Sequence, residues 1–275
     1  MDDLQRMTDI ASRAVRVPGV VGVMLGGSRA RGTHRADSDW DLGVYYRGEL
    51  DLAALESLAA AVTGGPVEVF GPGGWGAWVN GGAWLVLPDG SHVDWILRDV
   101  DRVRRVWQEC RAGRYETGMQ AGHPLGFWSP AYPGEVALGQ VLADTDGELA
   151  RLKEETRHYP ETLRTSLTGG ALWDAGFSAS MAAKSCGSGD ALHASLCLSR
   201  AVGDLVQALH AHHGIWCLNE KGALAAAAAL PATPSGFAAR ATALLGQLGG
   251  TPEELRRSLT EAERLVADVR AAVGD

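Results

Sequence analysis

The sequence predicts an α+β chain in which an N-terminal mixed-sheet domain is followed by an all-helical bundle domain. Short apolar runs and alternating segments, separated by Gly and Pro, fill the chain up to about residue 100. From Asp146 onward, one segment after another has apolar residues at helical spacing, without a convincing strand. Between the two halves, Gly, Pro and aromatic residues occur in mixed order. We therefore predict two domains, 1–140 and 141–275.

The elements of the N-terminal half follow from apolar spacing and from turn residues. Pro18-Gly19 and Gly64-Gly65-Pro66 each end a helical pattern, and Pro88-Asp89-Gly90 closes a hairpin. The predicted elements are helix 2–16, strand 20–25, a short helix from Ser28, strand 41–46, helix 51–62, strand 67–70, the hairpin strands 84–87 and 92–97, and helix 99–111.

Two stretches keep more than one interpretation. Residues 71–82 are Gly-rich, so they form either a flexible surface loop or a loop at the active site, where Trp75 or Trp78 stacks on a base or sugar. Residues 112–134 are predicted as a connection, and the tail 134–143 is either a short helix or a strand.

The C-terminal half is predicted to be helical throughout. Thr251 and Pro252 suit the cap and first position of its last helix. His210, His212 and His213 lie near a helix end, where cations suit the helix dipole better than they suit a metal site. The predicted helices are 147–167, 171–186, 190–213, 219–229, 235–248 and 252–273.

Composition narrows the class of protein. The chain has 275 residues, 46% of them hydrophobic and 21% charged, as in soluble globular proteins. A net charge of −8 argues against general nucleic-acid binding and favours a cationic substrate. The four cysteines lack C-x-x-C spacing, which argues against a zinc site or a disulfide framework. With neither a signal peptide nor an apolar run of membrane length, we expect a cytoplasmic protein.

The stretch from Gly26 to Asp41 carries the strongest chemical signal. A buried strand ends at Gly27-Ser28, where free backbone N–H groups and a hydroxyl offer an anion site. Asp39 and Asp41 open the next strand, and side chains two residues apart on a strand share a face. Two adjacent carboxylates repel each other unless a cation lies between them, and hard oxygen ligands suit Mg²⁺.

This pattern resembles the signature of the polymerase-β-like nucleotidyltransferase superfamily, which is strand, Gly-Ser, short helix, loop, and Asp-x-Asp on the next strand. The superfamily adds a third carboxylate between apolar residues on a later strand, and Asp94 in Val93-Asp94-Trp95 matches it. The resemblance implies that Asp39, Asp41 and Asp94 are catalytic and bind Mg²⁺, two ions in all. It also implies that Gly27 and Ser28 hold the β- and γ-phosphates.

The helical half resembles the C-terminal domain of small-molecule nucleotidyltransferases, which closes the active-site cleft over nucleotide and acceptor. Lys184, Gly189-Asp190 and the segment Leu218 to Gly222 carry this looser resemblance. It implies that Lys221 or Lys184 meets the triphosphate, although an exposed lysine is equally a solvated surface residue.

We therefore expect an enzyme that moves a nucleoside monophosphate, with AMP from ATP favoured, to a hydroxyl of a small molecule. The aminoglycoside- and lincosamide-modifying enzymes are the subtype it resembles, because the chain is acidic and has a helical half. Glu68, Glu109, Glu116 and Asp190 are candidates to receive a cationic sugar, and the sequence favours none of them. The alternatives are nucleotidylylation of a protein or tRNA in a regulatory or toxin–antitoxin role, and a binding module without catalysis.

Overall fold

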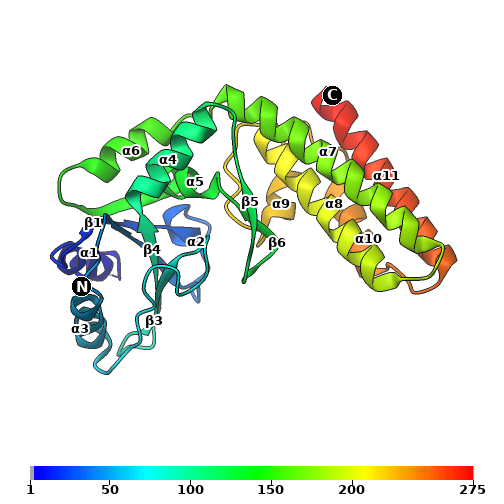
Figure 1. Cartoon of the computed structure of the whole chain (residues 1–275). Coiled ribbons are helices and arrows are strands. Elements are labelled where there is room, and N and C mark those ends of the chain that lie inside the picture. Colours follow the sequence, from blue (N-terminus) through cyan, green and yellow to red (C-terminus); the bar gives the residue numbers. More distant parts are fainter. Residues whose placement is uncertain (1–2, 275) are drawn as a thin grey trace. The chain divides into compact units, whose positions relative to one another are not determined.

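The computed structural model describes residues 3–274, which divide into two compact units. The sheet unit runs to Glu109 and includes residues 116–122 and 127–158. The helical unit consists of residues 110–115, 123–126 and the chain from Tyr159 onward. The prediction of a mixed sheet followed by helices is confirmed (Figure 1). The assignment of functions to residues 1–140 and 141–275 stays a prediction.

The first part of the chain alternates helices and strands, as its spacing predicts. The predicted start of the first helix at residue 2 lies outside the described residues. The elements are α1 (Asp3–Ala14), β1 (Val20–Leu25), α2 (Gly27–Ala30), β2 (Trp40–Tyr46), α3 (Leu52–Thr63), β3 (Gly81–Val86), β4 (His92–Asp99), α4 (Val100–Arg111), β5 (Thr117–Gln120), β6 (His123–Trp128), α5 (Ala131–Leu138), β7 (Gln140–Asp144) and α6 (Glu148–Thr156).

Five strands form the central sheet in the order β3-β4-β2-β1-β7. Strands β2 and β4 are parallel, and the other neighbours are antiparallel. Strands β5 and β6 form a separate two-stranded sheet. Strand β2 is therefore central. Trp40 and Asp41 at its start pair with β4, and from Leu42 onward the strand also pairs with β1.

One face of the sheet is the hydrophobic core of this unit. Leu42 and Val44 of β2 lie on it beside Val93, Trp95 and Leu97 of β4, and all five are buried. Helices α1 and α3 contribute further buried residues to the same cluster. Because side chains alternate along a strand, the residues between these five point to the opposite face.

The opposite face is covered at one end only. There Arg98 is almost fully buried and donates two hydrogen bonds to Glu135 of α5, at 2.6 and 2.8 Å. A third hydrogen bond, to the Val79 carbonyl, ties the loop before β3 to the sheet. At the other end of the face Asp41 and Asp94 are only partly buried. The half-open end of this face therefore leaves these polar side chains partly exposed.

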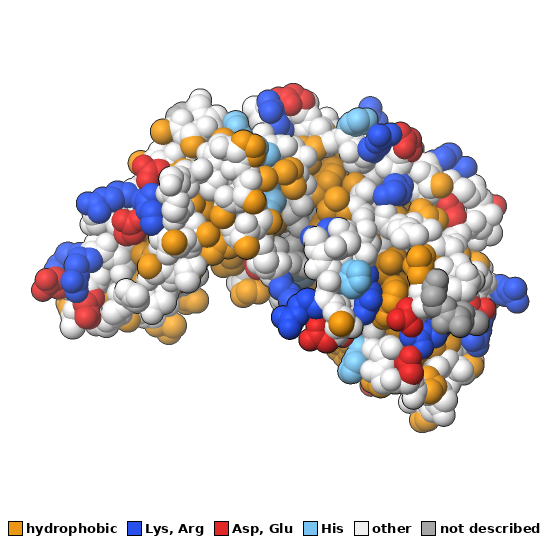
Figure 2. Space-filling model, turned by 180° about the vertical axis from the view of Figure 1, so that it is seen from behind, with side chains coloured by type: hydrophobic (Ala, Val, Ile, Leu, Met, Phe, Trp, Pro, Cys, Tyr) orange, Lys and Arg blue, Asp and Glu red, His pale blue; other side chains and the backbone are white. Residues whose placement is uncertain are grey.

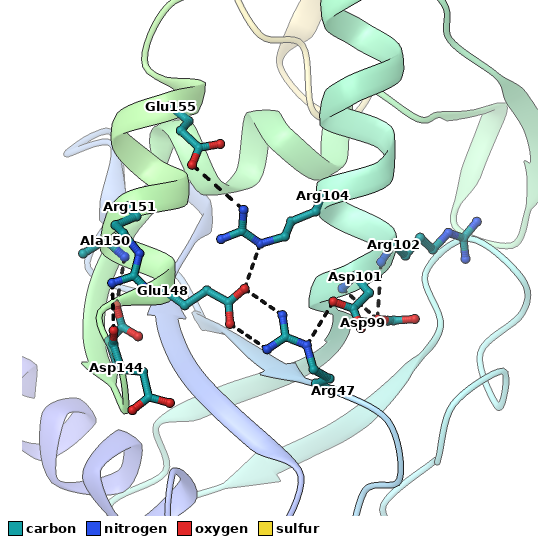
Figure 3. Close-up of polar contacts among 11 residues, drawn as sticks. Arg47, Asp99, Asp101, Arg102, Arg104, Asp144, Glu148, Ala150, Arg151 and Glu155 are labelled. Carbon is teal, nitrogen blue, oxygen red and sulfur yellow. Dashed lines mark hydrogen bonds and ion pairs between the residues drawn. The ribbon is translucent and has the colours of Figure 1, made fainter.

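A network of charged residues fastens α6 to the sheet (Figure 3). The Glu148 carboxylate accepts two hydrogen bonds from Arg47, at 2.7 and 2.9 Å, and one from Arg104 at 2.7 Å. Arg47 also donates to Asp101 of α4 at 2.9 Å. The hydrogen bonds from Arg47 are the main cause that lowers the pKa of Glu148.

We expect Glu148→Gln to destabilise the chain by about 1–2 kcal/mol at pH 7, because it removes a charge that two guanidinium groups share. The folded pKa lies below the unfolded one, so this stability is present above about pH 4.3 and fades as pH falls through the folded value. Thermal melts of both proteins at pH 7 and pH 3 measure the difference. Glu154→Gln is the control, because that exposed carboxylate of α6 pairs with the exposed Arg157 just past the end of the same helix.

The helical unit consists largely of two long antiparallel helices with shorter ones against them. Helices α7 and α8 share the largest contact surface, and α11 packs against both. The elements are α7 (Glu161–Cys186), α8 (Ala191–His212), α9 (Ala223–Ala228), α10 (Phe237–Gly246) and α11 (Pro252–Val273). A capping box at Thr251 and Glu254 begins α11, as predicted. No helix of residues 3–274 combines the length and hydropathy that a membrane crossing needs.

Three predicted elements were wrong in detail. The segment 67–70 is not a strand, because only Phe70 meets a partner, Gly82 at the start of β3. The helix predicted over 147–167 is two helices, since Pro160 interrupts the pattern between α6 and α7. The connection predicted over 112–134 contains β5 and β6, two short strands whose residues gave no clear alternation of polar and apolar side chains. The segment 134–143, for which both a helix and a strand were possible, contains the end of α5 and the start of β7.

Candidate active site

The register of β2 and β4 brings two of the predicted carboxylates together. Asp41 is the direct neighbour of Asp94 in the parallel ladder. Both side chains lie on the half-open face, because their strand neighbours Leu42, Val93 and Trp95 are in the core. The two segments are more than fifty positions apart in sequence, so only the pairing of the strands makes this site.

Asp39 adds a third negative charge from the end of the loop that precedes β2. It is exposed, whereas Asp94 is partly buried. Burial is the largest of the causes that raise the pKa of Asp94 to about 6, followed by the nearby charges of Asp41 and Asp39, against a smaller opposing effect of His92. The three carboxylates therefore repel one another electrostatically. This repulsion is unfavourable when no cation is bound, and a bound cation would remove it.

The Gly26-Gly27-Ser28 turn lies directly against this cluster. The N–H of Gly26 donates to the backbone carbonyl of Asp41 at 2.7 Å. Gly27 has φ +61°, and a Cβ on it would overlap the Asp41 carboxylate, with Cγ only 2.6 Å away. Only glycine allows the turn to approach the carboxylate so closely. Ser28 follows in α2, partly buried.

The arginines after the turn hold the loop in shape. Arg29 donates to the Ser38 carbonyl at 2.6 and 3.0 Å and to the Asp39 carbonyl at 3.2 Å. Its guanidinium lies over the Trp40 ring, 4.1 Å from the centroid. Arg31 donates to the Gly27 carbonyl at 3.0 Å. Arg29 therefore positions the backbone that carries Asp39, a role that the sequence did not reveal.

The donor set fits Mg²⁺, which prefers carboxylate oxygens. Asp39, Asp41 and Asp94 supply such oxygens, and their mutual repulsion is visible in the raised pKa of Asp94. Among residues 3–274, however, no group of three or more His, Cys, Asp or Glu side chains has its ligand atoms already gathered around one point.

The Gly-rich loop over 71–82 is held in place by side-chain contacts. The Gln120 side chain accepts hydrogen bonds from the N–H groups of Trp78 and Val79, both at 3.2 Å, and donates to the Trp75 carbonyl at 2.6 Å. Trp78 stacks on Phe127, with ring centroids 5.8 Å apart. Trp78 is thus occupied by protein partners, and the prediction that it stacks on a base or sugar has no support in this packing.

Trp84 is an aromatic residue of the site that sequence reasoning missed. It pairs with Asp94 across β3 and β4, and 61% of its surface is exposed. Its ring stacks on Trp75 with centroids 4.4 Å apart. The sequence could have indicated this position, because the turn at 88–90 sets the register of the hairpin, and that register places Trp84 opposite Asp94.

The predicted lysines belong to the helical unit. Lys184 lies in the last turn of α7 and is exposed. Lys221 precedes α9 and is also exposed, and its N–H donates to the Asn219 side chain at 3.1 Å. Their role at the triphosphate stays a prediction.

The histidines near the end of α8 make structural hydrogen bonds. His213 bonds the Leu209 carbonyl through Nδ1 at 2.8 Å, and its Nε2 accepts from the Ala232 N–H at 3.1 Å. His210 is buried and bonds the Val206 carbonyl. His210 and His213 thus make hydrogen bonds that close the helix end, and their interaction with the helix dipole stays a prediction.

Comparison with known proteins agrees with the geometry of the sheet unit. Residues 7–69 match the nucleotidyltransferase domain, and residues 134–221 match a domain of unknown function, DUF4037. The chain is similar to a solved structure of a nucleotidyltransferase-like protein from Exiguobacterium sibiricum 255-15. The two are 16% identical with a TM-score of 0.49, and the match covers 99% of this chain and 77% of that chain. Among curated proteins there is no match.

The first match contains the turn at Gly27 and the carboxylates of Asp39 and Asp41, and it ends before Asp94. A nucleotidyltransferase domain supports an enzyme, with nucleotidyl transfer as its general activity and a nucleoside triphosphate as its substrate. Asp94 joins the site through its register with Asp41.

Proposed function

We propose that the chain moves the AMP group of ATP to a hydroxyl of a small molecule, with Mg²⁺ as cofactor. The observation that carries this proposal is the pairing of Asp41 with Asp94 beside the Gly27 turn. The match of residues 7–69 to the nucleotidyltransferase domain supports the reaction class. The reaction takes place in the sheet unit, within the predicted catalytic region 1–140, and we infer a cytoplasmic enzyme.

Asp39, Asp41 and Asp94 are the residues that would hold Mg²⁺, two ions in this proposal. The ions would supply charge neutralisation at the triphosphate and a lower pKa for the acceptor hydroxyl. Gly27 and Ser28 would orient the β- and γ-phosphates through backbone N–H and hydroxyl groups. A lysine of the helical region 141–275, Lys221 or Lys184, would meet the triphosphate.

In the transfer, the acceptor oxygen forms a bond to the α-phosphorus, and the bond from that phosphorus to the leaving pyrophosphate breaks. The proton leaves the acceptor hydroxyl, and Asp94 is our candidate to receive it. Catalysis of this kind depends on positioning and on charge compensation, which agrees with three carboxylates and a fixed turn.

For the acceptor we propose an aminoglycoside or lincosamide antibiotic. The net charge of −8 favours a cationic substrate, and these compounds carry amino groups beside their hydroxyls. The alternative acceptor is a protein or a tRNA, in a regulatory or toxin–antitoxin role. A tRNA needs a basic groove, whereas on the face drawn in Figure 2 the Lys and Arg side chains lie interspersed with Asp and Glu.

Incubation with Mg²⁺, each labelled nucleoside triphosphate and a set of acceptors tests the function. Pyrophosphate release that depends on an aminoglycoside or lincosamide supports the proposal. Label on tRNA or on a protein supports the alternative. Absence of both release and nucleotide binding would contradict an active enzyme.

A further inference from the structure

Three side chains lie in one row across neighbouring strands on the half-open face. Asp41 of β2 is level with Asp94 of β4, and Asp94 is level with Trp84 of β3. The alternate residues of β3, Ala83 and Leu85, are buried in the core, so Trp84 shares the face of the two carboxylates. The Trp84 side chain is 61% exposed next to an acidic cluster. This is unusual, since an apolar surface as large as an indole is normally buried.

Two aromatic side chains of the loop before β3 pack against the Trp84 indole. Trp84 stacks on Trp75 at an interplanar angle of 24°, and Phe70 meets Trp84 edge-on with centroids 5.8 Å apart. Trp75 can lie against β3 because Gly82 has no side chain, since a Cβ there would come within 2.7 Å of the Trp75 ring. The backbone of Trp75 is held by Asn80 and by Gln120.

The order of the strands separates the two ends of the row. The Gly27 turn approaches Asp41 from the β1 side, whereas Trp84 lies on the β3 side, beyond Asp94. If the triphosphate is held at the Gly27 turn, the acceptor must approach the α-phosphorus from elsewhere, because attacking and leaving oxygens lie roughly in line. The side of the carboxylates opposite the turn is the Trp84 side.

We propose that Trp84, supported by Trp75, is the acceptor subsite and packs against the nonpolar face of a sugar or cyclitol ring that bears the reacting hydroxyl. Such rings have an apolar C–H face and a polar rim, which suits an indole next to carboxylates. This inference rests on the proposed function, because it takes the direction of transfer from it. Trp84 is a positioning residue and takes no part in the bond changes.

Calorimetric titration of the full chain with kanamycin and with lincomycin, in the presence of Mg²⁺ and a non-hydrolysable ATP analogue, tests the subsite. We expect at least one ring compound to bind, Trp84→Ala to weaken that binding about tenfold, and Trp84→Phe to retain most of it. The affinity for the ATP analogue should be the same in all three proteins. Trp173→Ala is the matched control, because Trp173 is equally exposed, at 62%, and lies on α7.

The outcomes separate this inference from the proposed function. Failure of both compounds to bind the wild-type chain, or equal affinity in wild type and Trp84→Ala, overturns the subsite while nucleotide binding stands. Equal weakening by Trp173→Ala also overturns it, because the effect is then not specific to the row. If the ATP analogue does not bind, the proposed function itself fails.

Discussion

Replacing Asp39 with Asn should lower kcat for nucleotidyl transfer by about 1,000-fold or more, with little change in stability. The carboxylate is exposed, and the hydrogen bond that Arg29 makes in this region goes to the Asp39 backbone carbonyl. The substitution thus removes one negative charge from the site and leaves the loop intact. Steady-state rates at saturating ATP and Mg²⁺, together with a thermal melt, measure both effects.

Asp37→Asn is the matched control for this prediction. Asp37 lies two residues earlier in the same loop, is mostly exposed and pairs only loosely with Arg35, at 3.4 Å. If the loss of activity came from the overall negative charge of the loop, the two variants would behave alike. An Asp39→Asn enzyme with more than a tenth of the wild-type kcat would contradict its assignment as a metal ligand.

The strands that carry the carboxylates could be predicted because the rules behind them are local. Asp39 and Asp41 precede an alternating apolar run, and Asp94 stands between Val93 and Trp95, which must be in the core. The turn at 88–90 then sets the hairpin. What local rules do not give is the pairing of β2 with β4, since a parallel register depends on partners far apart in sequence. The resemblance to a known signature supplied only the expectation that Asp94 joins Asp39 and Asp41, and the parallel pairing itself comes from the structure.

Other features depended on contacts that no local pattern encodes. The loop over 71–82 is ordered because Gln120, some forty residues later, bonds the backbone of Trp75, Trp78 and Val79. Trp84 joins the site through strand pairing and through the space left at Gly82. Both effects come from tertiary packing, which overrides the flexibility that many glycines predict on their own.

One buried carboxylate of the helical unit lies outside the proposed chemistry. Asp204 of α8 is 3% exposed, and among the described residues its Oδ2 has no hydrogen-bond donor. Its nearest cation is the Arg200 Nε at 3.7 Å. The pKa of Asp204 is raised to about 7, and burial is the main cause. Arg200 opposes this shift, and the charge of Asp174 adds to it. Tyr115 also lies near both carboxylates. Burial is the main cause that raises the pKa of its hydroxyl, and the two carboxylates add to the shift.

Asp204→Asn should therefore stabilise the protein at pH 8 by roughly 2 to 4 kcal/mol. The folded pKa of about 7 lies above the unfolded value near 3.9, so folding favours the protonated carboxyl. Below about pH 4 both states are protonated and the group has no effect. As pH rises from about 4 to 7, the unfolded carboxyl ionises while the folded one stays protonated, so the wild-type chain loses stability that the Asn variant keeps. Above about pH 7 both states are ionised and the loss levels off.

Thermal melts of both proteins at pH 4 and pH 8 measure this difference, which should be small at pH 4 and large at pH 8. Asp190→Asn is the control on the same helix, because Asp190 is exposed and caps α8, and Asn caps a helix equally well. A stability gain that is the same at both pH values would show that the amide improves packing, and no gain at pH 8 would show that Arg200 already compensates the buried charge.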